Sequence, residues 1–174
     1  MRLVGTDELV DGKYPGCIAH SNQQYLYGFF EFYAKCPIGF TKPCCFLYDE
    51  DRTVDPLHPK NEIDAFEYGG NLHYLVGTYV NGDVYGISYP TTKAIMQDVY
   101  HKWGIYWQPD AVRVYMDDHL VWETTDPAQV PAVPINIDLQ LAFGEWTYLP
   151  TDVTFPVYFD VDWVKVWVKD NTYR

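Results

Sequence analysis

Basic residues are scarce in this sequence, which has 12 Lys and Arg against 24 Asp and Glu among its 174 residues. The formal net charge of −12 disfavours nucleic acid and anionic membranes as partners, because both carry negative charge themselves. Long apolar runs are also lacking, since no stretch reaches the roughly 18 residues of a membrane-spanning helix. We therefore expect a protein that binds neither nucleic acid nor a membrane.

Cysteines with a metal-binding spacing are absent from the sequence. The four cysteines are Cys17, Cys36, Cys44 and Cys45, and the adjacent pair is awkward for an ordinary disulfide framework. We interpret them as buried free thiols. Residues 1–5 contain no apolar signal segment, so the sequence itself does not indicate export.

Aromatic residues, by contrast, are abundant: they make up 18% of the chain and include 16 Tyr and 6 Trp. Such a surplus suits either the packed core of a β-sandwich or a surface that stacks on flat ligands, of which sugar rings are one kind. The length is that of one domain with a substantial core. We predict a single domain over residues 1–174, in which the glycine-containing, acidic residues 1–16 form a loose lead-in.

Short strands separated by turn residues account for most of the sequence. The turn Asn81-Gly82-Asp83 between two apolar stretches indicates a hairpin. Only residues 92–99 have the pattern of a short helix. Many short strands with frequent turns predict an all-β sandwich of two antiparallel sheets. The predicted strands are two within 18–35 that join near 22–24, then 44–48, 62–68, 74–80, 84–89, 100–107, 112–116, 120–123, 135–143 and 157–168.

Three carboxylates crowd the stretch Asn61–Tyr68, which otherwise resembles a strand. Side chains alternate between the two faces of a strand, so Glu62 and Asp64 share a face while Glu67 falls on the opposite one. A β-bulge at residues 65–66 would return Glu67 to the shared face, because two residues then take the place of one. Like charges this close raise one another's pKa, so one carboxyl group should keep its proton near neutral pH.

The spacing alone leaves two interpretations of this stretch open. The first is an acidic strand that faces solvent, which is a common arrangement. The second is a catalytic site, because glycoside hydrolysis uses an ionised carboxylate as nucleophile beside a protonated one as acid.

Four other segments accompany the carboxylate stretch in a fixed order. They are Tyr27–Lys35 before it, and Tyr100–Pro109, Leu139–Gly144 and Val161–Val166 after it. Together the five segments resemble glycoside hydrolase family 16, from about residue 16 to residue 170. The resemblance implies a concanavalin A-like β-jelly-roll and an endo-glycanase of the laminarinase, lichenase or agarase kind.

The resemblance also implies a role for each carboxylate. Glu62 is expected to be the nucleophile, Glu67 the acid and then the base, and Asp64 a hydrogen-bond partner of the nucleophile. Retaining hydrolysis needs the two reacting carboxyl groups roughly 5–5.5 Å apart, so the side chains must converge over the bulge. The expected substrate is a β-linked polysaccharide, first a β-1,3- or mixed β-1,3/1,4-glucan. The family leads us to expect a monomer that works outside the cell or in the periplasm.

Five residues are predicted to bind the substrate. Tyr79 lies in a sequence segment that resembles a substrate-contacting strand of lichenases. Trp146 resembles the cleft Trp of several family members, although a loop Trp can also cap the edge of a sandwich. The other three stand where the family pattern differs: Tyr33 in place of the usual Arg, Gln140 in place of Asn, and His58 as the remainder of a platform before the nucleophile.

Two other functions stay open from the sequence. One is a galactanase of the agar, porphyran or carrageenan type, which the missing Arg and Trp platforms and the bulged motif favour. Against it, the acidic chain has few basic residues to hold sulfated sugars. The other is a non-catalytic carbohydrate-binding relative, since the same sandwich serves lectins, and the three intact carboxylates argue against it.

Four tryptophans in strands are predicted to lie in the core: Trp103, Trp107, Trp163 and Trp167. Many family members hold a structural Ca²⁺ near the chain ends, where Asp162 could contribute a ligand. One carboxylate is too little to define such a site. We therefore predict no metal site and no cofactor.

Overall fold

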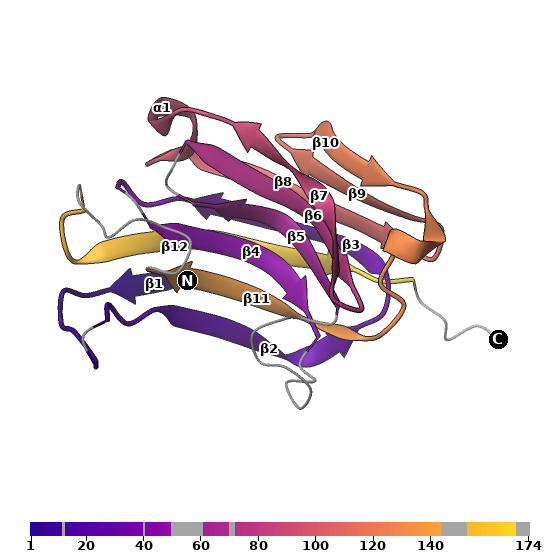
Figure 1. Cartoon of the computed structure of the whole chain (residues 1–174), viewed down its shortest axis with the longest axis horizontal. Helices are drawn as coiled ribbons and strands as arrows, with labels where there is room; N and C mark the ends of the chain where they lie inside the picture. Colours follow the sequence, from indigo (N-terminus) through magenta and orange to yellow (C-terminus); the bar gives the residue numbers. More distant parts are fainter. Residues whose placement is uncertain (12, 40, 50–60, 70–71, 144–152, 170–174) are drawn as a thin grey trace.

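The computed structural model of the chain describes residues 1–11, 13–39, 41–49, 61–69, 72–143 and 153–169 (Figure 1). Its strands form two six-stranded sheets, in which every pairing of named strands is antiparallel. Sheet I has the order β1 (Arg2–Gly5), β12 (Val157–Trp167), β3 (Gly28–Lys35), β8 (Tyr100–Gln108), β9 (Ala111–Met116), β10 (His119–Thr124). Sheet II has the order β2 (Cys17–Tyr25), β11 (Ile135–Ala142), β4 (Lys42–Tyr48), β5 (Asn61–Tyr68), β6 (His73–Val80), β7 (Asp83–Pro90).

Helical structure among the described residues is limited to two short elements. These are α1 (Lys93–Met96) and the single-turn 3₁₀ helix η1 (Pro127–Gln129). Thr92 caps α1, since its side chain accepts a hydrogen bond from the backbone N–H of Ile95 at 3.3 Å. No helix in these ranges has the length and apolar character needed to cross a membrane.

The two sheets stack face to face, and their inner faces share one core. Phe66 of sheet II stacks on Trp103 of sheet I, with the ring centroids 4.7 Å apart. Along β3 the residues alternate between buried and half-buried, so Phe30 and Phe32 point inward. Each such buried aromatic contributes about 2 kcal/mol or more to stability. The predicted core positions of Trp103 and Trp107 are confirmed.

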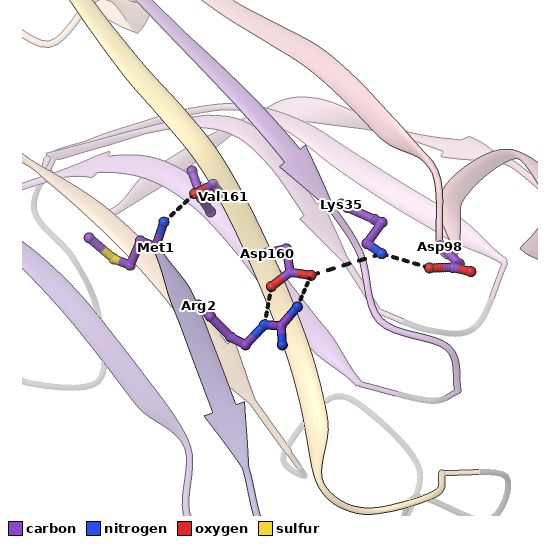
Figure 2. Close-up of polar contacts among 6 residues, drawn as sticks. All are labelled: Met1, Arg2, Lys35, Asp98, Asp160 and Val161. Carbon is purple, nitrogen blue, oxygen red and sulfur yellow. Dashed lines mark hydrogen bonds and ion pairs between the residues drawn. The ribbon is translucent and has the colours of Figure 1, made fainter.

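Strand β1 was not predicted, because residues 1–16 were expected to form a loose lead-in. It pairs with β12 so that Arg2 lies opposite Asp160. The Arg2 guanidinium donates to both oxygens of this carboxylate, at 2.5 and 2.9 Å, and Lys35 Nζ lies 3.9 Å from it (Figure 2). The hydrogen bond from Arg2 lowers the pKa of Asp160. Because the partners are 158 residues apart, no local pattern could reveal this strand.

The junction between β2 and β3 also differs from the prediction. It lies at residues 26–27, where Tyr27 has a φ of 65°, and not near residues 22–24. Those residues continue β2 through a register shift against β11. The hydroxyl of Ser21 accepts a hydrogen bond from the backbone N–H of Ile137 at 2.9 Å, which replaces a ladder bond there. A polar run in an edge strand was mistaken for a turn.

The prediction that Trp163 and Trp167 lie in the core is wrong. A register shift between Val161 and Trp163 changes the face that each following residue of β12 presents. Val161 is buried, whereas Trp163 stacks on Tyr33 at 5.5 Å on the outer face of sheet I. Trp167 is 49% exposed.

All four cysteines are free. Cys36, Cys44 and Cys45 are buried, which confirms the prediction for three of them, and Cys17 is half-buried. Burial raises the pKa of each buried thiol well above its ordinary value, so these residues stay protonated at neutral pH.

Candidate active site

Strand β5, which carries the three carboxylates, occupies a central position of sheet II between β4 and β6 (Figure 1). Ile63 lies in the core between the sheets, so its neighbours Glu62 and Asp64 point to the outer face of sheet II. Asn61 begins the strand, and its side-chain amide donates to Asp49 at 3.2 Å. The start of β5 is thereby tied to the residue that follows β4.

A β-bulge follows Asp64, as the sequence predicts. Opposite β4, Asp64 pairs with Phe46 and Phe66 pairs with Cys45, so Ala65 has no partner residue. Opposite β6, the register shifts between Asp64 and Glu67 in the same way. The extra residue leaves Phe66 in the core and turns Glu67 to the outer face. All three carboxylates therefore share one face.

The three carboxylates converge. One carboxylate oxygen from each of Glu62, Asp64 and Glu67 lies within 4.8 Å of one from each of the others. Glu62 is 8% exposed and Asp64 is fully buried, whereas the side chain of Glu67 is 19% exposed. The cluster thus has a buried side and an accessible side, and Glu67 lies on the accessible one.

Burial perturbs the protonation of two members of this cluster. Burial, followed by the charge of Glu67, raises the pKa of Glu62 from 4.5 to about 7, although its contact with Asp64 acts in the opposite direction. Burial, followed by the charges of Glu62 and Glu67, raises the pKa of Asp64 well above its ordinary value. No N–H or O–H group of the described residues donates a regular hydrogen bond to either Asp64 oxygen. Asp64 therefore keeps its proton, and the carboxylate of Glu62 is the natural acceptor for it.

Lys42 is a member of the site that the sequence reasoning missed. Its ammonium lies 3.2 Å from Glu67 Oε1, and only 15% of its side chain is exposed. Burial would lower the pKa of Lys42, but the surrounding acidic groups, Cys44 and Glu67 foremost, outweigh burial and raise it. The cation offsets part of the charge repulsion within the cluster. The sequence alone could not place Lys42 in the site, because its proximity to Glu67 follows from the pairing of Cys44 with Glu67.

Tyr79, a predicted substrate contact, lies beside the carboxylates. It is the cross-strand partner of Glu62 on β6, so both side chains project from the same face. Burial, followed by the charges of Asp64 and Glu62, raises the pKa of the Tyr79 phenol. The neutral hydroxyl is therefore available to donate a hydrogen bond next to the cluster.

Gln140 also lies on the outer face of sheet II. Its neighbours Leu139 and Leu141 are in the core, and it pairs with Cys44 on β4, whose other partner is Glu67. The structure thus brings Gln140 to the face of the carboxylates, two strands away from them. It adds Asp138 on the same face, a fully buried residue that pairs with His20 and was not predicted.

The comparisons with known proteins agree with this geometry. The sequence profile described as "Glycosyl hydrolases family 16" matches residues 6–165. The chain belongs to glycosyl hydrolase family 16. This family member is accordingly a glycoside hydrolase, as predicted. A search of curated protein sequences gives no match.

Solved structures give the same fold. The β-glucanase of Bacillus licheniformis is 26% identical, with a TM-score of 0.76 over 97% of this chain and 78% of that one. The laminarinase catalytic domain of Thermotoga maritima is 20% identical, with a TM-score of 0.78 over 98% and 78%. The endo-β-1,3-glucanase of Pyrococcus furiosus is 19% identical, with a TM-score of 0.77 over 95% and 73%. The predicted β-jelly-roll is confirmed.

Not every predicted substrate contact of this family 16 chain lies at the carboxylates. Tyr33 projects from the outer face of sheet I, because its neighbours Phe32 and Ala34 are in the core. It stacks there on Tyr100 and Trp163, on the opposite side of the sandwich from β5. Tyr33, predicted to bind the substrate, therefore does not lie with the carboxylates. Two further predicted contacts lie outside the described residues: His58 and Trp146.

A cation-binding role for this site is limited by its own charges. Within the described residues, Glu62, Asp64 and Glu67 are the one group of three side chains whose atoms could hold a metal ion. The Lys42 ammonium already lies against Glu67, and Asp64 favours its neutral form, which leaves little net negative charge for an ion. The absence of a metal and of a cofactor remains a prediction.

Proposed function

We propose that this chain is an endo-acting, retaining hydrolase of a β-linked polysaccharide, with a β-1,3- or mixed β-1,3/1,4-glucan as its substrate. The observation that carries the proposal is the convergence of three carboxylates within 4.8 Å over the bulge of β5. This separation fits the roughly 5–5.5 Å of retaining enzymes and not the 6.5–9.5 Å that inverting enzymes need to admit a water. Structural relatives that are named as β-glucanases and laminarinases support the substrate class.

In the proposed reaction Glu62 and Glu67 act from opposite ends of the scissile bond. The Glu62 carboxylate attacks the anomeric carbon, while Glu67 gives its proton to the departing glycosidic oxygen. The bond from the anomeric carbon to that oxygen breaks, and a glycosyl ester of Glu62 forms. Glu67 then takes a proton from a water molecule, which attacks the same carbon and releases Glu62. The accessible position of Glu67 suits contact with both leaving group and water.

Asp64 and Lys42 hold these two groups in place. Burial retains a proton on Asp64, and a hydrogen bond from it to Glu62 would keep the nucleophile oriented and ionised when substrate is bound. The ion pair from Lys42 restrains the side chain of Glu67 at 3.2 Å. Tyr79 beside Glu62, and Gln140 two strands away, are suited to hydrogen-bond the hydroxyl groups of the sugars.

The two alternative functions have less support. A galactanase that acts on sulfated chains would need cations to hold them. Among the described residues of this face, Lys42 lies beside the carboxylates, and its ammonium is already paired with Glu67. A non-catalytic binding protein would not need two buried carboxyl groups, Glu62 and Asp64, whose burial costs stability. The structural relatives named above, which are a β-glucanase, a laminarinase and an endo-β-1,3-glucanase, favour neither alternative. Secretion, which is common in this family, remains part of the proposal.

The function is tested by digestion of laminarin, lichenan, barley glucan and agar, with the products resolved by size. Wild type should release a ladder of oligosaccharides from at least one glucan, and no release from any of the four would contradict the proposal. Glu62→Ala and Glu67→Ala should each lose turnover by more than about a thousandfold, whereas the exposed Glu123→Ala should not. Azide should restore turnover of an activated glycoside by Glu62→Ala and give a glycosyl azide of inverted configuration. Full activity in either cluster variant would refute the assigned roles.

A further inference from the structure

A pocket lies on the outer face of sheet I, on the opposite side of the sandwich from the carboxylates. It has a volume of about 330 Å³ and lies over β3, β8 and β9. Its floor is Gly104, whose neighbours Trp103 and Ile105 point into the core. A β-carbon at Gly104 would lie 3.4 Å from the ring of Phe29 and 3.5 Å from Tyr115, so the missing side chain opens the space between them.

Aromatic rings form the walls of this outer pocket. Phe29 on β3 and Tyr115 on β9 flank the floor with their rings nearly perpendicular, at 81° and 6.4 Å between centroids. Tyr106 closes one end as the cross-strand partner of Phe29. Beyond Phe29 the exposed Trp167 continues the aromatic surface, with its ring centroid 5.6 Å away. Such rings present flat apolar faces to a ligand that is itself flat and apolar on one side.

Charged groups form the other end of the outer pocket, and they neutralise one another. Lys102 Nζ lies 3.6 Å from Glu31 and 2.5 Å from Asp118. Two carboxylates and one ammonium leave no excess of positive charge, which disfavours an anionic ligand such as a phosphate or a sulfated sugar. Carboxylates accept hydrogen bonds from hydroxyl groups and an ammonium donates them, so the group suits a neutral ligand that bears several hydroxyls.

We propose that the outer pocket is a second carbohydrate-binding site, which holds a neutral sugar unit of the same polysaccharide that the carboxylate face cleaves. A pyranose ring combines an apolar face for Phe29 and Tyr115 with hydroxyls for Glu31 and Lys102. The volume is at the small end of ligand pockets, which limits the bound part to one or two rings. The identity of the polysaccharide rests on the proposed function, whereas binding itself does not. Two attachment points would keep the enzyme on a polymer between cuts by raising its effective concentration there.

The test measures retention of the whole chain in native gels that contain laminarin, lichenan, barley glucan or agar. Glu62→Gln is the background, so that turnover does not consume the polymer. On that background Tyr115→Ala and Glu31→Gln should each raise the apparent dissociation constant for the polymer by about tenfold. Tyr100→Ala is the matched control, since it removes an outward ring of the same sheet that stacks on a neighbour but does not line the pocket. With Glu62 intact, both pocket variants should keep wild-type kcat and KM on a short soluble oligosaccharide.

The outcomes separate this inference from the proposed function. Retention that depends on the pocket in a protein that cleaves none of the polymers would refute the hydrolase and leave the binding site standing. Cleavage without pocket-dependent retention would refute the binding site alone, as would equal loss in the Tyr100→Ala control or no retention on any polymer. Retention only on a polymer that is not cleaved would refute the shared substrate. A change of oligomeric state in Tyr115→Ala without a change of retention would show a protein interface in its place.

Discussion

Replacement of Glu62 by glutamine should stabilise the protein at alkaline pH and change its stability little at pH 4.5. In the folded chain, burial and then the charge of Glu67 raise the pKa of Glu62 to about 7. Because this value lies above that of the unfolded chain, the stabilising contribution of protonated Glu62 is fully present below pH 4.5. It is lost as the pH rises through 7, where the folded protein must ionise a buried group. Glutamine has no proton to lose.

The size of the effect follows from the same values. A rise of the pKa from 4.5 to about 7 corresponds to about 3 kcal/mol, since each pH unit is worth about 1.4 kcal/mol. Solvent screening reduces this little, because Glu62 is almost completely buried. The charge of Glu62 also raises the pKa of Asp64, so the variant removes a second unfavourable interaction at high pH. The gain from the substitution should therefore approach about 3 kcal/mol at pH 8.

Urea unfolding at several pH values from 4.5 to 8 measures this difference directly. The quantity of interest is the free energy of unfolding of the variant minus that of wild type, in which titrations elsewhere in the chain cancel. Glu123→Gln is a suitable control, because Glu123 is exposed, accepts a hydrogen bond from Arg113 at 3.1 Å, and belongs to a kind of pair worth at most about 1 kcal/mol. Parallel profiles for wild type and Glu62→Gln between pH 5 and 8 would refute the argument that burial holds this proton.

Substitutions at Asp64, Tyr79 and Gly77 test the surroundings of Glu62, with Gly104 as a comparison for Gly77. Asp64→Ala should lower kcat by about a hundredfold and Asp64→Asn by less, because an amide can still donate to Glu62; equal losses in kinetic assays would contradict this. Tyr79→Phe should raise KM for an oligosaccharide by about tenfold through loss of one hydroxyl, and an unchanged KM would exclude that contact. Gly77→Ala should lower the urea-unfolding free energy by more than about 2 kcal/mol, because its β-carbon would lie 2.3 Å from the carbonyl oxygen of Tyr85. Gly104→Ala, which meets only ordinary contacts, should lower it by less.

The elements of the fold that depend on local patterns were predictable from the sequence. The hairpin of β6 and β7 turns at Asn81 and Gly82, as the predicted turn requires. The elements that depend on distant partners were not. β1 exists because Arg2 and its neighbours pair with β12 at the far end of the chain, and the continuation of β2 past residues 22–24 depends on its pairing with β11. Register against another strand leaves no trace in a short window of sequence.

In the candidate site, too, local patterns were predictable from the sequence and contacts between distant strands were not. Glu62, Asp64 and Glu67 could be grouped in advance, because their spacing and a single bulge fix their common face. Lys42 could not, since nothing near it in sequence says that β4 brings it to Glu67. Tyr33 was predicted to bind the substrate by analogy with an arginine of the family, whereas its strand belongs to the other sheet. The role of a residue can be inferred from a family only when the residue also lies on the corresponding face of the corresponding strand.

Bulges, more than loops, decide what the outer faces of this sandwich present. With regular alternation after Asp64, β5 would turn Glu67 into the core and Phe66 outward, at a cost of several kcal/mol for the unpaired buried carboxylate. The extra residue reverses both side chains at once. In β12 a similar irregularity turns Trp163 outward, where it stacks on Tyr33. Because the side-chain period of a strand is two, the separation of the carboxylates depends on the register of β5 against β4 and β6. Catalysis as proposed therefore requires the pairing of β5 with both β4 and β6.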